Sequence, residues 1–168
     1  MLSAVAAIGN NNVIGGNNGL LWHLPADLKK FKAITMAGSR TMIMGRKTFE
    51  SLPGVLPGRK HIVLTNNTDF HVESDNVEVV HSIEEVGPYI QSEEEYFVIG
   101  GGQIYKLLMP YTSKMYITRV YGDFVGDTYF PEWDESQWKI IDRVEGVQDE
   151  KNRFRHELIT YVRKSIKS

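Results

Sequence analysis

Short apolar segments alternate with helical segments along most of this 168-residue chain, and this alternation restricts its fold more than any other feature. Apolar runs bounded by glycine, proline or asparagine are typical of buried strands. Strands separated by helices favour a parallel sheet covered on both faces, and the last part of the chain contains strands alone. We therefore expect one α/β domain over residues 1–168, with a mixed, mostly parallel sheet and a C-terminal antiparallel hairpin.

The expected elements follow one another without a linker or repeat. Strands are expected at 2–8, 41–44, 61–65, 77–81, 96–99, 115–121, 138–145 and 154–163. Helices are expected to begin near Pro25, Gly45, Ile83 and Gln103. Residues 9–21 contain four glycines and five asparagines, which indicates little regular structure. A loop of this length inside a compact domain is usually functional or mobile.

Composition and charge exclude several classes of function. The net charge of −2 argues against general nucleic-acid binding. The chain has no cysteine, which excludes disulfides and thiol catalysis, and the histidines show no metal-ligand spacing. The first apolar run is too short to span a membrane and lacks the basic leader of a signal peptide, so we expect a cytoplasmic protein without a metal.

Asp27 lies in the first turn of the helix expected from Pro25. Steps of about 100° per residue place four residues in one sector, which should face the interior: Leu24, Asp27, Leu28 and Phe31. Lys29 and Lys30 are expected to point away. A buried carboxylate is costly without a partner, and a bound ligand with N–H donors would supply one. The alternative is a solvated aspartate that stabilises the helix start, and position alone does not separate the two.

Two segments that follow expected strands contain residue types that bind phosphate. Gly100–Gly102 would let backbone N–H groups approach an anion closely, although three glycines also suit a tight turn. Arg46–Thr48 supplies two cations and a hydroxyl at a helix start, a pattern also found on solvated surfaces. Together they suit a dinucleotide with an additional phosphate, which favours NADPH over NADH. Thr65 and Asn66 could bond the same phosphate.

Arg59 follows Leu56-Pro57-Gly58 at the rim of an expected strand. One interpretation is an ordinary surface arginine. The other is a planar, bidentate donor for a substrate carboxylate. The residues themselves leave both open.

In this order, the segments resemble dihydrofolate reductase of the bacterial branch. The matching stretches are Val13–Gly15, Trp22–Leu28 with Phe31, Met44–Ser51, Leu56–Arg59, Val98–Tyr105 and Gly126–Pro131. The resemblance implies an eight-stranded sheet flanked by about four helices, a cis peptide between Gly100 and Gly101, and a monomer. It implies reduction of 7,8-dihydrofolate to 5,6,7,8-tetrahydrofolate for one-carbon metabolism, by NADPH-dependent hydride transfer to C6 and protonation of N5. Antifolates would then be inhibitors, and neither nucleic acid nor membrane would be a partner.

The resemblance also assigns residues to roles. The expected catalytic residues are Asp27, Trp22, Leu20 and Thr118. Asp27 would bind the 2-amino group and ring N–H of the pterin, Thr118 would bond the carboxylate, and Trp22 would hold an ordered water. Substrate contacts are expected from Val5, Ala6, Asp27, Leu28, Phe31, Leu52, Leu56, Arg59, Ile99 and Thr118. Cofactor contacts are expected from Ala7, Ile14, Gly15, Asn18, Leu20, Gly45, Arg46, Lys47, Thr48, Leu64, Thr65, Asn66, His81, Ile99, Gly100, Gly101, Gly102, Gln103, Ile104 and Tyr105.

Two segments depart from the family pattern. Leu21 stands where the family usually has proline, and Ser51–Leu56 differs at the mouth of the folate cleft. Two other functions therefore stay under consideration. A pyrimidine reductase of flavin synthesis would share the fold without needing Trp22 and Asp27, and a non-catalytic module would bind NADPH alone.

Overall fold

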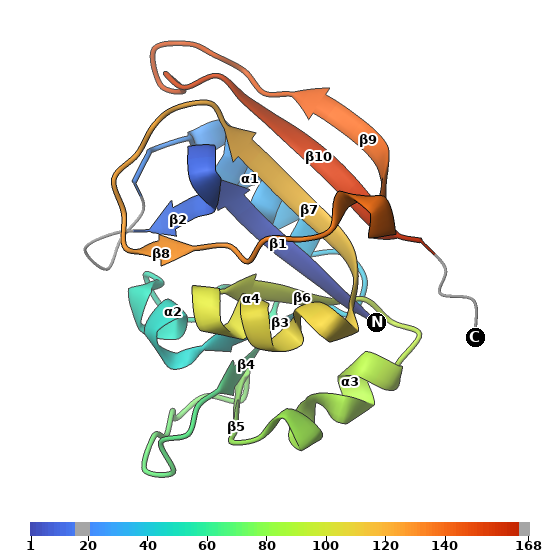
Figure 1. Ribbon diagram of the computed structural model, residues 1–168. Coiled ribbons are helices and arrows are strands. Elements are labelled where there is room, and N and C mark those ends of the chain that lie inside the picture. The colour runs from blue at the N-terminus through green and yellow to red at the C-terminus, as the bar shows by residue number, and fades with distance from the viewer. Residues whose placement is uncertain (16–20, 165–168) are drawn as a thin grey trace.

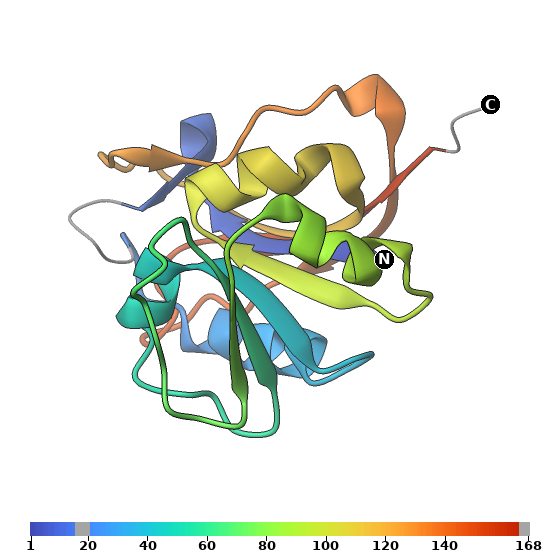
Figure 2. The ribbon, with the colours of Figure 1, turned by 90° about the horizontal axis from the view of Figure 1, so that it is seen from below.

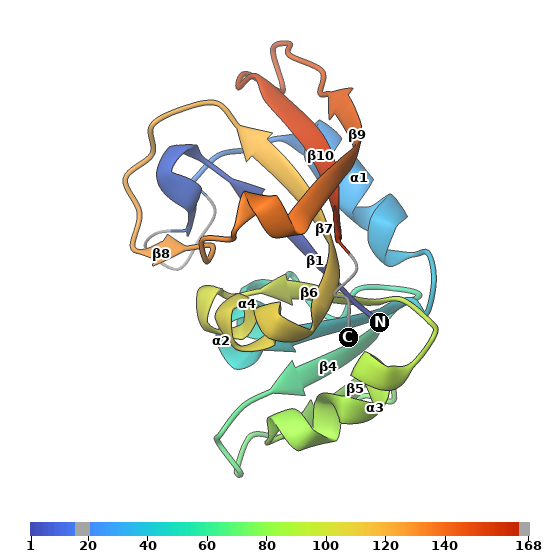
Figure 3. The same cartoon turned by 45° about the vertical axis from the view of Figure 1, so that its right-hand side comes forward.

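An eight-stranded sheet forms the centre of the computed structural model, which describes residues 1–15 and 21–164 (Figure 1). The strand order is β5-β4-β3-β6-β1-β7-β10-β9. The strands are β1 Leu2–Ile8, β3 Thr41–Gly45, β4 Lys60–Leu64, β5 Val77–Val80, β6 Tyr96–Gly100, β7 Thr112–Val120, β9 Trp138–Glu145 and β10 His156–Arg163. The pairs from β5 to β7 are parallel, and β10 runs antiparallel to β7 and β9. The expected sheet and C-terminal hairpin are confirmed, with β9 and β5 at opposite edges (Figure 3).

Helices cover both faces of this sheet. They are α1 Pro25–Thr35, α2 Arg46–Ser51, α3 Gly87–Gln91 and α4 Gly102–Leu108. Helix α1 lies on one face, and α3 and α4 lie on the other (Figure 2). The helix expected from Ile83 is two pieces, the 3-10 turn η2 Ile83–Val86 and α3, because Pro88 has no N–H with which to continue the first. No helix among the described residues is long and apolar enough to cross a membrane.

The central strands are buried, whereas the edge strand β9 is exposed. Every residue of β1 except Ala7 is buried, and Met42, Ile43 and Met44 of β3 are fully buried. In β9 only Trp138 is buried. This explains why β1, β3 and β6 are mostly apolar, since a strand covered on both faces needs no polar alternation.

A second, two-stranded sheet lies beside β1, where little regular structure was expected (Figure 1). After the 3-10 turn η1 Asn10–Asn12, β2 Val13–Gly15 pairs with β8 Thr128–Tyr129. The N–H of Asp127 also donates to the Gly15 carbonyl at 2.9 Å. At Gly126 a Cβ would lie 2.4 Å from that same carbonyl oxygen, so only glycine fits.

Helix α1 is capped from a distant part of the chain. Its own N-cap residue, Leu24, has no side chain able to accept a hydrogen bond. The side-chain oxygen of Asn152 accepts instead from the backbone N–H of Ala26 at 2.9 Å.

Two further 3-10 turns lead into strands of the main sheet. The η4 turn Glu135–Gln137 precedes β9, and the η3 turn Met109–Tyr111 joins α4 to β7.

Candidate active site

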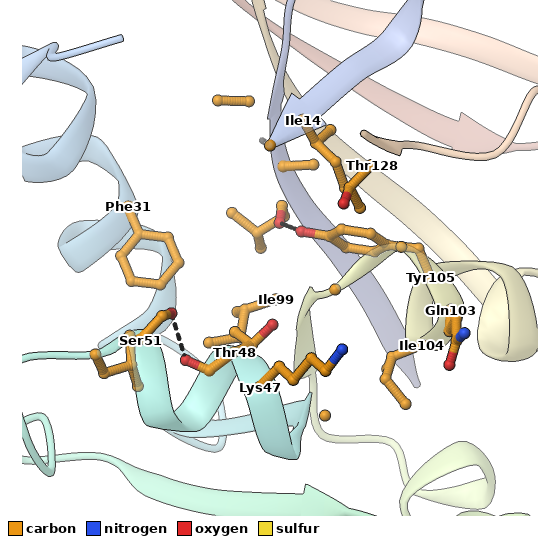
Figure 4. Close-up of a pocket in the computed structure, with 18 of the residues that line it drawn as sticks. Ile14, Phe31, Lys47, Thr48, Ser51, Ile99, Gln103, Ile104, Tyr105 and Thr128 are labelled. Atoms are coloured by element: carbon orange, nitrogen blue, oxygen red, sulfur yellow. Dashed lines mark hydrogen bonds between the residues drawn. The ribbon is translucent and has the colours of Figure 1, made fainter. Parts of the chain in front are cut away.

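A cavity of about 1390 Å³ crosses the carboxyl ends of the central strands. Its walls come from β1, α1, α2, β6 and α4, with contributions from the β2–β8 sheet. Figure 4 shows Phe31 of α1, Lys47 and Thr48 of α2, and Ile99 of β6 around this space, with Ile14 and Thr128 near Tyr105. The ends of parallel strands are the usual position of ligand sites in open α/β sheets.

Asp27 lies in the cavity wall, partly buried, in the first turn of α1. The hydroxyl of Thr118, on β7, donates to its Oδ1 at 2.5 Å. Burial raises the pKa of Asp27 above its ordinary value, while the Thr118 hydrogen bond and the charges of His156 and Lys30 offset part of this rise. The second carboxylate oxygen has no hydrogen bond among the described residues. The group can therefore accept N–H donors from a ligand in the cavity.

Two predictions about the Asp27 face were wrong. Lys30 does not point away: three residues amount to 300°, which leaves it only about 60° from Asp27 around the helix. Its ammonium nitrogen is buried. Leu28 does not enter the core, because its side chain is 50% exposed and faces the open cavity.

Most of the expected substrate contacts form the apolar part of this cavity. The lining residues are Val5, Ala6, Leu28, Phe31, Leu52, Leu56 and Ile99, together with Asp27, Arg59 and Thr118. The fully buried His61 helps to hold this wall, because its Nε2 accepts from the backbone N–H of Leu56 at 3.0 Å. Trp22 also lines the cavity and packs on Phe124, with ring centroids 4.9 Å apart.

Arg59 is only 6% exposed, which excludes the interpretation as an ordinary surface arginine. Its Nη1 donates to the hydroxyl of Thr35 at 3.0 Å, and its Nε donates to the Pro57 carbonyl at 3.2 Å. These bonds fix the plane of the guanidinium. Since Arg59 also lines the cavity, its remaining N–H groups are positioned for an anionic ligand.

The glycine-rich end of the cavity joins β6 to α4. The peptide between Gly100 and Gly101 is cis. Gly101, Gly102, Gln103, Ile104 and Tyr105 line the cavity. Gly100 does not: it is buried beneath Tyr105, whose hydroxyl donates to the Val5 carbonyl at 2.6 Å.

The basic end follows β3 and β4. Gly45, Arg46, Lys47, Thr48, Leu64, Thr65, Asn66 and His81 all line the cavity. Arg46 pairs with Glu50 one turn later at 2.8 Å, while Lys47 is exposed. The Nδ1 of His81 lies 2.8 Å from the Thr65 carbonyl, which ties the two strand ends together. Two cations near several hydroxyls and amides suit a phosphate ester.

The remaining expected contacts lie on the first loop. Ala7, Ile14 and Gly15 line the cavity, and Asn18 and Leu20 lie outside the described residues. Sequence reasoning missed Tyr116 and Leu158, which line the cavity from β7 and β10. Leu158 is paired with Thr118 in the sheet register, so only the strand order places it near Asp27.

The fold and the site define the class of protein: an α/β oxidoreductase with a basic, glycine-rich cofactor end beside an acidic ligand pocket. A family model for dihydrofolate reductase matches residues 1–163. The chain therefore belongs to the dihydrofolate reductase family.

Similar proteins support this membership over nearly the full length. The chain is 45% identical over 165 residues to a dihydrofolate reductase of Bacillus subtilis, covering 98% of this chain and 96% of that protein. It is 41% identical over 163 residues to a dihydrofolate reductase of Staphylococcus aureus, covering 97% and 98%. A solved dihydrofolate reductase from Enterococcus faecalis, complexed with NADP(H) and RAB-propyl, has a TM-score of 0.87 and 41% identity, covering 98% and 97%.

Proposed function

We propose that this protein reduces 7,8-dihydrofolate to 5,6,7,8-tetrahydrofolate in an NADPH-dependent reaction that supplies one-carbon metabolism. The observation that carries the proposal is the Asp27 carboxylate, bonded by Thr118 in the same cavity as a glycine-rich, basic end. The reaction adds a hydride to C6 and a proton to N5 of the pterin. Each part of the cavity then has a chemical task.

The acidic pocket would bind the pterin. The Asp27 carboxylate accepts from the 2-amino group and the ring N–H, and Thr118 orients it through their hydrogen bond. Trp22 holds an ordered water beside the ring. The apolar wall encloses the pterin and aminobenzoyl rings, and Arg59, fixed by Thr35 and Pro57, binds the glutamate α-carboxylate.

The cofactor end fits a phosphorylated dinucleotide. A Cβ at Gly45 would lie 3.0 Å from Ile104, so glycine allows the loops after β3 and β6 to approach each other. Arg46, Lys47, Thr65 and Asn66 would hold the adenosine phosphate, and Thr48 with Gly101 and Gly102 the pyrophosphate. When bound, NADPH supplies the hydride. The further proposed contacts are Ala7, Ile14, Gly15, Leu64, His81, Ile99, Gln103, Ile104 and Tyr105, and by resemblance alone Asn18 and Leu20.

The proton is proposed to reach N5 through water, because Asp27 binds the far edge of the pterin ring. The chain's task is to hold the carboxylate with its pKa raised by burial, so that a larger fraction is protonated near neutral pH. The rate is therefore expected to fall as Asp27 ionises. The apolar wall around the ring excludes competing water from C6.

The test is an initial-rate assay with purified protein, NADPH and dihydrofolate. NADPH absorbance should fall only when dihydrofolate is present, and an antifolate should compete with dihydrofolate. Oxidation that does not depend on dihydrofolate, or none at all, would overturn the proposal in favour of a cofactor-binding module.

We also propose that the protein acts as a monomer in the cytoplasm. Within this one chain the cavity already brings together the Asp27 pocket, the apolar wall and the basic, glycine-rich end, which supports a monomer. Reduced folates and NADPH are intracellular metabolites, which supports the location. Light scattering after size exclusion tests the first point, and cell fractionation tests the second.

A further inference from the structure

Lys30 carries a buried ammonium on the same helix as Asp27. Its Nζ atom is buried and has no hydrogen-bond partner among residues 1–15 and 21–164. It also belongs to none of the ion pairs formed by those residues. An ammonium removed from water without a partner costs free energy, so its position is unusual for a lysine.

Helix geometry puts Lys30 next to Asp27. Residues three apart on a helix are neighbours, with Cβ atoms about 5–6 Å apart. Leu28 and Phe31 line the cavity on the other side of Asp27, whereas Lys30 does not line it. Lys30 therefore lies next to Asp27 on the helix without forming an ion pair with it, and its charge acts on the carboxylate from outside the cavity.

Few other charged groups face Asp27. Strand β7 contributes the neutral hydroxyl of Thr118, and the phenol of Tyr116 on the same strand is bonded to Glu95 at 2.9 Å. Strand β10 contributes His156, which is fully buried and lies 2.9 Å through Nδ1 from the Phe154 carbonyl. Among lysines and arginines, Lys30 is the one whose charge favours the ionised form of this carboxylate on the same helix.

We propose that Lys30 is a positioning residue that acts through Asp27: its buried ammonium favours the ionised carboxylate and so strengthens the binding of N–H donors in the cavity. Charges in a protein interior interact more strongly than in water, because little solvent screens them. Together with the proposed function, this implies a compromise. Lys30 strengthens the binding of the pterin ring by Asp27, but it lowers the pH at which the rate begins to fall.

The decisive experiment is a carbon-13 NMR titration of the Asp27 carboxyl group in the ligand-free protein. The signal is assigned with Asp27→Asn. In Lys30→Met, which keeps an unbranched side chain one atom shorter and removes its charge, the midpoint should rise by about half a pH unit or more. Lys30→Arg should titrate near the unmodified protein.

Lys29→Met is the matched control, because Lys29 is exposed and lies on the opposite side of α1. His156 is unchanged in all these variants, so the difference between Lys30→Met and Lys29→Met isolates Lys30. Identical midpoints in the two methionine variants would overturn the proposal. So would a Lys30→Arg titration that matches Lys30→Met.

Kinetics give a second measurement that a purely structural role would not produce. In Lys30→Met, KM for dihydrofolate should rise. The pH at which the rate falls on the alkaline side should increase by the same interval as the NMR midpoint. For half a pH unit, the rate on that side should be about threefold higher. Absence of turnover in every variant would count against the proposed function, and the NMR titration would still decide the role of Lys30.

Discussion

Asn152 and Ala26 are joined by a 2.9 Å hydrogen bond between a side-chain oxygen and a backbone N–H, although 126 positions separate them in the chain. Asn152 is only 6% exposed, and its own amide donates to Asp149 at 3.0 Å. The connection between β9 and β10 therefore fixes the start of the helix that presents Asp27.

Replacing Asn152 with alanine should lower the free energy of unfolding by about 1 kcal/mol, because a part-buried helix-start N–H loses its acceptor. Urea denaturation measures the change. Lys151→Ala, at the exposed neighbouring position, serves as the control and should differ from the unmodified protein by less than about 0.5 kcal/mol. Equal stability of the two variants would contradict the assigned cap.

Asp27→Asn should separate stability from activity. Burial raises the folded-state pKa of Asp27 above its unfolded value. The folded state therefore loses stability as pH rises from the unfolded-state pKa through the folded-state pKa. The amide keeps an acceptor for Thr118 and has no charge to bury, so unfolding at neutral pH should require equal or more urea. Turnover of dihydrofolate should fall about a hundredfold or more. Near-normal turnover at neutral pH would refute the role of Asp27.

Replacing Arg46 and Lys47 with neutral residues should weaken the binding of NADPH about tenfold or more, because charge-assisted hydrogen bonds to a phosphate are lost. NADH has no such phosphate and should be affected much less. The ratio of the two KM values is the measurement. Glu50→Gln is the control, since it removes the partner of Arg46 but keeps the cation. Equal loss for both cofactors would refute the phosphate site.

Glu157 should contribute to acid stability. Hydrogen bonds from Arg143 at 2.7 Å and Tyr121 at 2.7 Å lower the pKa of Glu157 from 4.5 to about 2. A lowered folded-state pKa stabilises the fold above the unfolded value, and this contribution is lost as pH falls from 4.5 through about 2. Melting temperatures recorded over that interval should depend less on pH in Glu157→Gln. An unchanged slope would show that another carboxylate controls acid unfolding.

The sequence predicted local features well and long-range neighbours poorly. Apolar runs and Pro25 indicated the central strands and α1, because these signals act within a few residues. The β2–β8 pair was not predicted, since Val13 and Tyr129 are partners that no local periodicity connects. The cap by Asn152 was missed for the same reason.

The environment of Asp27 shows the same limit within the site. Its position toward the cavity followed from helix periodicity, whereas its charged neighbours did not. The charge of His156 acts on it only because β10 returns beside β7, and Lys30 was placed wrongly by treating a 60° offset as an opposite face. The residue-by-residue roles came from resemblance to the family, and the experiments above test them.

The central place of β1 has a consequence for synthesis on the ribosome. Leu2 pairs with Tyr96 and Thr112, so this strand leaves the ribosome long before either neighbour exists. At about 5–20 residues per second it waits roughly 5–20 s with apolar side chains and backbone groups unpaired. The growing chain should therefore need a chaperone at its first strand, and it is more prone to aggregate than the finished protein.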